Sequence, residues 1–206
     1  VDCILRDGLL DPLSGKHMGE IAEMTSLEMN ITRIEQDEYA ILSYQLAKKA
    51  WDSEKYKQEI VPITIHTPKG ETIISNDEEY GKINYEKISQ LKPAFVKTGE
   101  KGTITAANSS KLNDGASAIL LSDQREGAIA EIIGYGEAEL EPSKFTIAPS
   151  VAIPLALSRA FPGDSLSVGL SKVSRMEVNE AFSVVALANH KLLHLDQYPH
   201  IAYNAH

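Results

Sequence analysis

The sequence predicts an α/β protein, and two stretches support that prediction. Residues 103–121 read as a half-buried strand, a polar turn of small residues and a second, apolar strand. Residues 176–178 read as a short strand that ends at Asn179, and a helix of apolar residues follows from Ala181. Open α/β sheets place their chemistry where a strand ends and a helix begins, which makes the Asn179 junction a candidate part of a functional site. The small side chains of residues 106–110 leave backbone groups open to a ligand, which makes the first stretch another candidate.

The remaining elements follow from periodicity and from turn chemistry. Apolar residues recur at helical spacing in four stretches, which we expect to be helices: residues 19–30, 33–55, 148–160 and 182–193. Three further stretches are expected to be strands: residues 61–67, 72–75 and 128–136. Thr32 and Glu35 match a capping box at the start of the longest helix. Residues 76–92 are expected to form a polar surface excursion and residues 161–169 a loop.

The bulk composition is that of an ordinary globular protein. The chain has 206 residues, of which 43% are hydrophobic and 24% charged, and its net charge is −9 at pH 7. This acidic balance argues against nucleic acid as a partner, and it means that an anionic ligand needs a local basic patch. No apolar run reaches the length of a membrane helix, so no membrane span is predicted.

The chain has one cysteine, Cys3, which excludes an internal disulfide. Cys3 lies in an apolar run, and nothing in the local sequence indicates a helix start that would activate the thiol. We therefore expect Cys3 to be a buried core residue.

Seven sequence blocks form a recognisable set when taken in order. They are HMGEIAE (17–23), EQDEYAILSY (35–44), EIVPITI (59–65), DEEY (77–80), TAANSSKLNDGASA (105–118), APSVAIP (148–154) and VNEAFSVVALAN (178–189). Together they resemble the thiolases, most closely the potassium-activated, mitochondrial-type acetyl-CoA acetyltransferase branch. The resemblance spans almost all of residues 1–200 and keeps the family's order and nearly its spacing.

The resemblance implies the layered αβαβα thiolase fold, with this chain corresponding to the central part of it only. Residues 1–111 would be the loop domain that binds coenzyme A. Residues 112–126 would be the last strand of the N-terminal core domain, and residues 127–206 part of the C-terminal core domain. A change in composition near residues 124–127 also predicts a domain boundary there.

The implied activity is that of an acetyl-CoA C-acetyltransferase, which condenses two acetyl-CoA molecules to acetoacetyl-CoA or catalyses the thiolytic reverse. The reaction would proceed through an acyl-cysteine whose cysteines lie outside this sequence, so the segment alone is expected to be inactive. Two alternatives stay open: a longer-chain 3-ketoacyl-CoA thiolase, and a noncatalytic, truncated coenzyme A-binding or assembly protein. Tyr44 favours the short-chain branch.

The resemblance also assigns roles to individual residues. Asn179 would be catalytic, positioning a water in an oxyanion hole; the competing interpretation is that Asn179 caps the following helix. Coenzyme A would be bound by the following residues: His17, Met18, Tyr44, Lys82, Lys87, Phe95, Ala106, Ser110, Ala181 and Phe182. A potassium ion would be held by the tyrosine hydroxyl and by backbone carbonyls: Tyr44, Ala106, Ala107 and Ser109.

For most of these residues an ordinary structural role competes, such as core packing for Phe95 and Tyr44 or a solvated surface for Lys82 and Lys87. Acyl-CoA thioesters are the expected partners, with no organic prosthetic group, and a homodimer or homotetramer is the expected assembly. Mitochondria are the expected compartment, with the cytoplasm as the alternative. His206 is given no catalytic role.

Overall fold

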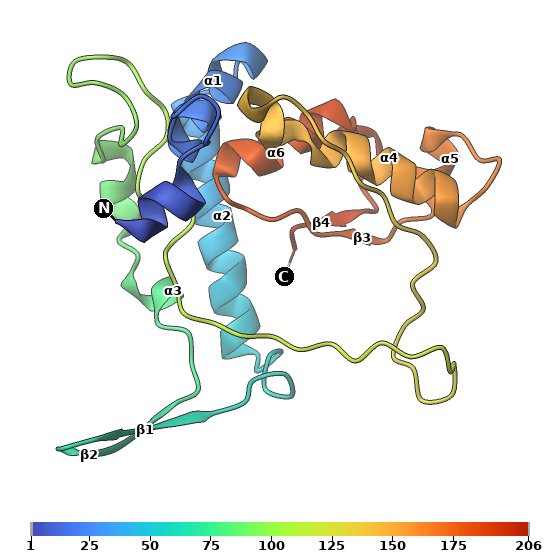
Figure 1. Ribbon diagram of the computed structural model, residues 1–206, viewed down its shortest axis with the longest axis horizontal. Coiled ribbons are helices and arrows are strands. Elements are labelled where there is room, and N and C mark those ends of the chain that lie inside the picture. The colour runs from blue at the N-terminus through green and yellow to red at the C-terminus, as the bar shows by residue number, and fades with distance from the viewer. Residues whose placement is uncertain (1, 206) are drawn as a thin grey trace.

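The computed structural model describes residues 2–205, and helices dominate it (Figure 1). The α-helices are α1 (Met18–Met29), α2 (Arg33–Asp52), α3 (Glu79–Lys82), α4 (Pro149–Ala160), α5 (Leu166–Ser171) and α6 (Ser183–Leu192). The shorter helical turns are η1 (Leu5–Leu9), η2 (Tyr85–Gln90), η3 (Pro142–Ile147) and η4 (Leu195–Gln197).

Four strands form two small sheets. The strands β1 (Ile63–Thr67) and β2 (Gly70–Ile74) pair in antiparallel as a hairpin that projects away from the helices (Figure 1). The strands β3 (Arg175–Met176) and β4 (Ala202–Tyr203) pair in parallel, close to α6. A parallel pair needs a connecting segment long enough to cross over, and here α6 and η4 supply it.

The hydrophobic core is built around α6. Val184 and Ala188 of this helix are fully buried, and the helix contacts α1, α2, α4 and η3. Leu170 and Ile201 extend the same cluster towards the β3–β4 pair. Because α6 begins directly after the predicted Asn179 junction, the core fixes the position of that junction.

The predicted helices and the predicted hairpin are confirmed, with ends shifted by a few residues. The capping box at α2 is also confirmed: the Thr32 hydroxyl accepts from the Glu35 N–H at 3.2 Å, and the Glu35 carboxylate accepts from the Thr32 N–H at 2.6 Å. The Thr32 hydrogen bonds lower the pKa of Glu35. The predicted loop 161–169 is wrong in its second half, because Ser165 caps α5 there.

The strands predicted at residues 103–107, 116–121 and 128–136 are wrong: none of the three is a strand in this structure. A strand is stable only when a neighbouring strand satisfies its backbone groups and covers its apolar side chains. Residues 112–140, which we call the apolar arm, instead run extended past the helices (Figure 1), and Ile119 and Leu120 are 86% and 94% exposed. The assignment of residues 112–126 to an N-terminal core domain stays a prediction.

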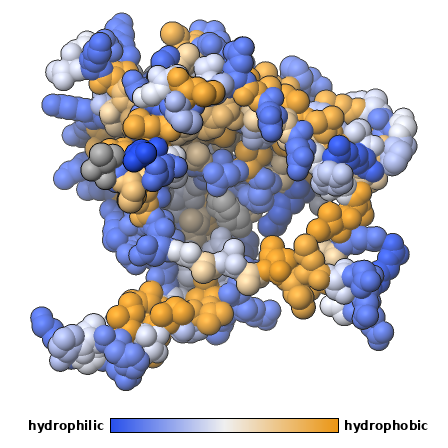
Figure 2. Space-filling model, in the orientation of Figure 1, coloured by the Kyte–Doolittle hydropathy of each residue, from blue (hydrophilic) through white to orange (hydrophobic). Residues whose placement is uncertain are grey.

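Two surfaces of the molecule expose contiguous apolar side chains. One is the β1–β2 hairpin, where the exposed Ile63, Ile65 and Ile74 share a face, and the other is the apolar arm, with Ile129 and Ile132 exposed. Both appear as orange areas that stand apart from the main body in Figure 2. Exposed apolar patches of this kind mark surfaces that bind other protein surfaces.

The prediction that Cys3 is buried is wrong. Cys3 is exposed and lies in a helical turn immediately before η1, where the N–H of Ile4 donates to the Asp2 carboxylate at 2.9 Å. Ile4 and Leu5 are exposed as well, so the apolar run around Cys3 does not reach the core.

Candidate functional site

The two stretches that the sequence analysis singled out meet in the structure. The backbone N–H of Ser110 donates to the carbonyl of Ala181 at 2.9 Å, and the N–H of Ser183 donates to the carbonyl of Asn108 at 2.9 Å. Ser109 and Phe182 form an antiparallel bridge between these two bonds. Residues 103–110, which we call the small-residue loop, are therefore fastened to the turn that leads from Asn179 into α6.

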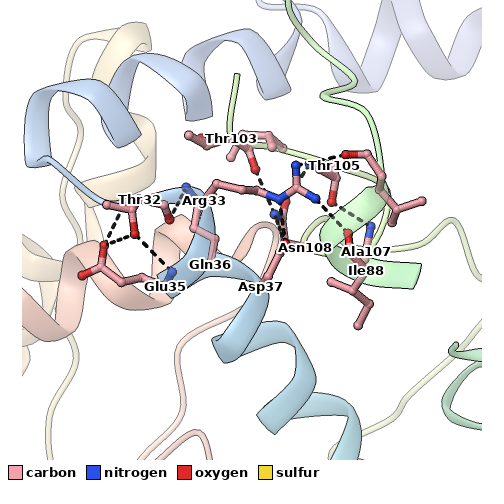
Figure 3. Close-up of polar contacts among 12 residues, drawn as sticks. Thr32, Arg33, Glu35, Gln36, Asp37, Ile88, Thr103, Thr105, Ala107 and Asn108 are labelled. Atoms are coloured by element: carbon pink, nitrogen blue, oxygen red, sulfur yellow. Dashed lines mark hydrogen bonds and ion pairs between the residues drawn. The ribbon is translucent and has the colours of Figure 1, made fainter. Parts of the chain in front are cut away.

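Asn108 holds the small-residue loop to α2 (Figure 3). Its side chain is 2% exposed, and its amide nitrogen donates to the Asp37 carboxylate and to the Thr103 carbonyl, each at 3.0 Å. Its amide oxygen accepts from the Thr105 N–H at 2.8 Å. Both hydrogens and the oxygen of this amide are bonded inside the protein, which favours one conformation of the loop.

Asp37 is in turn held by Arg33, one helical turn earlier (Figure 3). The Arg33 Nε donates to Asp37 at 2.8 Å, and the two remaining guanidinium nitrogens donate to the carbonyls of Ile88 and Leu91 at 2.8 and 3.1 Å. The guanidinium therefore links α2, η2 and the small-residue loop in one network. Sequence reasoning missed this network. Arg33 and Asp37 stand at helical i,i+4 spacing, but the groups that they bind on Ile88, Leu91 and Asn108 are far away in the chain.

Glu23 of α1 fastens the start of the same loop. Its carboxylate accepts from the N–H groups of Thr103 and Ile104 at 2.8 and 2.7 Å, and from the Thr103 hydroxyl at 2.8 Å. Sequence reasoning gave Glu23 no role. The only local signal is its place next to the buried residues Ile21 and Ala22, where an acidic side chain needs a partner.

An aromatic stack lies on one side of the two joined loops. The rings of His17 and Phe95 stack at 4.7 Å between centroids, and Phe95 meets Phe182 edge-on at 6.1 Å. Met18 and Ala181 pack beside them against the core. Five of the residues predicted to contact coenzyme A are therefore close together: His17, Met18, Phe95, Ala181 and Phe182.

His17 also determines where α1 begins. Its ring nitrogen Nδ1 accepts from the Gly19 N–H at 3.0 Å, and its own N–H donates to Glu20 at 2.7 Å, which together form a capping box. Gly19 is required because a Cβ there would lie 2.3 Å from Cγ of Phe95. His17 thus has an ordinary structural role at a helix start, and the face of its ring stacks on Phe95.

A cavity of about 300 Å³ borders the small-residue loop. Its walls include Tyr44, Ala107, Ser109, Ser110 and Glu180. Three of the four predicted cation ligands are thus wall residues: Tyr44, Ala107 and Ser109. Burial, followed by the nearby charges of Glu79 and Asp77, raises the pKa of Tyr44, so its hydroxyl stays protonated.

The fourth predicted cation ligand, Ala106, already has a positively charged partner. The ammonium of Lys111 donates to the Ala106 carbonyl, and Lys111 itself is part of the cavity wall. Within residues 2–205 no group of three or more His, Cys, Asp or Glu side chains is arranged to hold a metal ion. The four predicted ligands offer neutral oxygens, and the cavity wall also includes the acidic residues Asp77 and Glu180.

Lys82 and Lys87, predicted to approach the phosphate end of coenzyme A, are not among the residues that line this cavity. The Lys82 ammonium is paired with Glu79 and Glu78 at 2.8 and 3.3 Å, and the Glu79 hydrogen bond raises the pKa of Lys82. Lys87 is exposed in η2. The structure therefore does not bring these two lysines to the cavity wall.

Asn179 does not cap the following helix, so that interpretation is wrong. The residue at the cap position of α6 is Phe182, and Asn179 lies before the turn. The Asn179 side chain is exposed and makes no hydrogen bond within residues 2–205. Its amide is therefore available to a ligand or a water.

Comparisons with known proteins show the family to which the chain belongs. The N-terminal domain model of the thiolase family matches residues 1–125, and the C-terminal domain model of the same family matches residues 127–202. The mitochondrial acetyl-CoA acetyltransferase of Gibberella zeae is 46% identical over 203 residues, which are 95% of this chain and 46% of that protein. The mitochondrial acetyl-CoA acetyltransferase of Mus musculus is 45% identical over 204 residues, again 95% of this chain and 46% of that protein.

Solved structures give the same result. The acetyl-CoA acetyltransferase of Bacillus anthracis superposes with a TM-score of 0.81 at 36% identity, covering 96% of this chain and 49% of that one. The Acat5 thiolase of Ascaris suum, solved in complex with coenzyme A, gives a TM-score of 0.79 at 37% identity and covers 100% of this chain and 51% of that one. The chain spans about half the length of the curated relatives it matches. Because the two family models together match nearly the whole sequence, the chain belongs to the thiolase family.

Proposed function

We propose that the protein acts as an acetyl-CoA C-acetyltransferase, forming acetoacetyl-CoA from two acetyl-CoA molecules or cleaving it with coenzyme A. The single observation that best supports this is the joining of the small-residue loop to the Asn179 turn through Ser110 and Ala181. Near this contact lie the aromatic stack that includes Phe182, the cavity that includes Ser110, and the exposed amide of Asn179. The relatives named above are acetyl-CoA acetyltransferases, and the Ascaris suum structure contains coenzyme A.

The aromatic stack is the proposed wall for the pantetheine arm of coenzyme A. His17, Phe95 and Phe182 offer flat, apolar surfaces, and Met18 adds a flexible thioether beside them. Ala106 and Ser110 would contribute backbone and hydroxyl contacts. Lys82 and Lys87 would approach the phosphates, and Lys82 would have to exchange a carboxylate partner for a phosphate to do so.

Asn179 is the proposed catalytic residue. Its amide nitrogen would donate to a water that in turn donates to the thioester oxygen, where negative charge develops during carbon–carbon bond formation or cleavage. A preorganised donor of this kind contributes about 3–4 kcal/mol to transition-state stabilisation. The role is supported by the exposed amide and by its place at the end of a segment fixed by the core.

The cavity beside Tyr44 is the proposed position for a potassium ion. The Tyr44 hydroxyl and the carbonyls of Ala106, Ala107 and Ser109 are neutral oxygens, which suit a weakly hydrated monovalent cation. The ion would share the Ala106 carbonyl with the Lys111 ammonium or displace it. Its proposed effect is to stiffen the small-residue loop and so reduce the cost of ordering that loop on coenzyme A binding.

The proposal also covers the assembly and the location of the protein. We propose a homodimer or homotetramer, supported by the exposed apolar side chains of the β1–β2 hairpin and of the apolar arm. We propose a mitochondrial location because the two relatives above are named as mitochondrial. Among residues 2–205, no helix combines the length and apolar character needed to cross a membrane.

The proposal is tested by comparing thiolysis rates on the full gene product. Acetoacetyl-CoA and a medium-chain 3-ketoacyl-CoA are supplied separately with coenzyme A, and the proposal predicts a higher kcat/KM for acetoacetyl-CoA. Faster cleavage of the longer chain would instead favour a long-chain thiolase. Binding of coenzyme A without turnover of either substrate would favour a noncatalytic binding protein.

A further inference from the structure

Glu180, the residue after Asn179, is the centre of a polar cluster to which the proposed function gives no role. We propose that Glu180, held by Tyr39 of α2 and by Asn204 after β4, is a positioning residue that fixes the direction of the Asn179 amide. The inference rests on the proposed catalytic role of Asn179.

Three donors surround the Glu180 carboxylate. Its Oε1 accepts from the Tyr39 hydroxyl at 2.6 Å and from the Asn204 amide at 3.2 Å, and its Oε2 accepts from the Ser43 hydroxyl at 2.6 Å. Hydrogen bonds to a charged oxygen are short and strong, so this side chain has little freedom. Burial and the Glu180 hydrogen bond raise the pKa of Tyr39, which keeps the phenol protonated as a donor.

Asn204 holds the backbone on the other side of Asn179. Its side-chain oxygen accepts from the Val178 N–H at 2.7 Å, and its side-chain nitrogen donates to the Val178 carbonyl at 3.0 Å. The Asn204 N–H also donates to the Met176 carbonyl at 2.9 Å. Asn204 is 3% exposed and has a left-handed backbone with φ of 43°, a conformation that asparagine tolerates better than most residues.

Because Glu180 and Asn204 are both held in place, Asn179 lies between two fixed neighbours in the chain. Val178 is bound through its backbone, Glu180 is bound through its side chain, and Asn204 donates to both. The Tyr39 hydroxyl joins them, because it accepts from Asn204 at 2.8 Å and donates to Glu180. Only Asn179 in this stretch has a side chain that is exposed and, within residues 2–205, unbonded. Catalytic groups displaced by about 1 Å lose on the order of a hundredfold in rate, so such rigidity bears directly on catalysis.

If the cluster only stabilised the fold, its loss would have a different effect on catalysis. A comparison with Tyr203 distinguishes this structural role from the proposed positioning role. Tyr203 lies next to Asn204 and, like Tyr39, is a half-buried tyrosine whose pKa is raised mainly by burial. Its hydroxyl donates to the Ala186 carbonyl at 2.8 Å and makes no hydrogen bond to Glu180. Tyr39→Phe and Tyr203→Phe therefore remove the same group from similar surroundings, but only Tyr39→Phe loosens Glu180.

The test compares both variants in the full gene product, with kcat, the KM for coenzyme A and the melting temperature measured for each. We expect Tyr39→Phe to lower kcat about tenfold without a change in KM, and Tyr203→Phe to keep kcat within about twofold while lowering the melting temperature to a similar extent. In an Asn179→Ala background, Tyr39→Phe should lower kcat no further, because the group that it positions is gone. Ser43→Ala, which removes a half-buried donor from the same carboxylate, is the substitute if Tyr39→Phe does not fold.

Two results would overturn the inference. One is a loss of kcat that follows the melting temperature equally in Tyr39→Phe and Tyr203→Phe. The other is a full, multiplicative effect of Tyr39→Phe in the Asn179→Ala background. If Asn179→Ala alone retains the wild-type kcat, the proposed role of Asn179 fails and the inference fails with it. If Asn179→Ala is impaired and Tyr39→Phe is not, only the inference fails.

Discussion

Ser110 donates its backbone N–H to the carbonyl of Ala181 at 2.9 Å, which brings together two segments that are far apart in the chain. One segment supplies the small-residue loop and the other supplies the Asn179 turn. The contact is made between backbone atoms, so it depends on the position of the two segments more than on the identity of the side chains. The helices α1, α2 and α6 provide that position through Glu23, Asp37 and the core.

Asn108 is expected to be important for stability, because its amide satisfies buried groups on α2 and within the loop. Asn108→Ala leaves the Thr105 N–H and the Asp37 carboxylate without this partner and should lower the free energy of unfolding by about 1–3 kcal/mol. Asn113→Ala, an exposed asparagine beyond the loop, is the matched control and should change it by less than about 0.5 kcal/mol. Urea unfolding measures both. Equal midpoints for the two variants would contradict the role given to Asn108.

Gly19 is expected to tolerate no side chain. In Gly19→Ala the new Cβ would meet the Phe95 ring, so Phe95 must move away from His17. The variant should lose about 1–3 kcal/mol of stability and bind coenzyme A more weakly. Gly81→Ala in α3 is the control, because nothing lies within 4 Å of a Cβ there. Isothermal titration with coenzyme A and thermal unfolding test the pair. Unchanged affinity in Gly19→Ala would remove the aromatic stack from the proposed binding site.

Stability is expected to depend on pH through His190. Burial lowers the pKa of His190 below its ordinary value of 6.5, and its ring meets Tyr203 edge-on at 5.4 Å. The unfolded state therefore binds the proton more readily, so this contribution is complete above pH 6.5 and is lost as the pH falls from that value through the lower pKa of the folded state. His190→Phe keeps an aromatic ring and removes the titration. Melting temperatures between pH 7.5 and pH 5.5 should fall less in the variant than in the wild type. Parallel pH profiles would show that other groups govern this range.

The cation proposal predicts opposite effects at two positions in the cavity wall. Tyr44→Phe removes a neutral oxygen and should weaken activation by potassium. Lys111→Met removes the ammonium that donates to the Ala106 carbonyl and should strengthen it. The measurement is the rate in potassium divided by the rate in sodium, taken for each protein at subsaturating coenzyme A. A ratio of one for the wild type and for both variants would exclude the site.

Much of the helical structure follows from local sequence, because caps and periodicity are local properties. Thr32 and Glu35 predict the start of α2 for this reason. The strands predicted around Ile119 and Ile129 fail because a strand depends on a partner, and no segment among residues 2–205 pairs with them. An apolar pattern indicates that a segment could form a strand. Whether the strand forms depends on a neighbouring strand, which the pattern does not supply.

In the candidate site, too, some features could be predicted from the sequence and others depend on tertiary packing. The resemblance to the thiolases predicted that residues 105–110 and 179–182 act together, and the structure joins them. The local sequence offered a competing cap role for Asn179, which is wrong because α6 begins only at Ser183. The supports of the site were not predicted. Glu23 and Glu180 find their partners through tertiary packing, and each looks like an ordinary helix or turn residue in the sequence.

The most direct test of the central claim is the turnover of acetoacetyl-CoA by the full gene product with and without Asn179→Ala. The account predicts that kcat falls by about 10²–10³ while the KM for coenzyme A stays within about twofold, because the amide acts on the transition state and does not hold the cofactor. Asn76→Ala, an exposed asparagine outside the site, should match the wild type. An Asn179→Ala protein with the wild-type kcat would contradict the claim that this junction is the catalytic site.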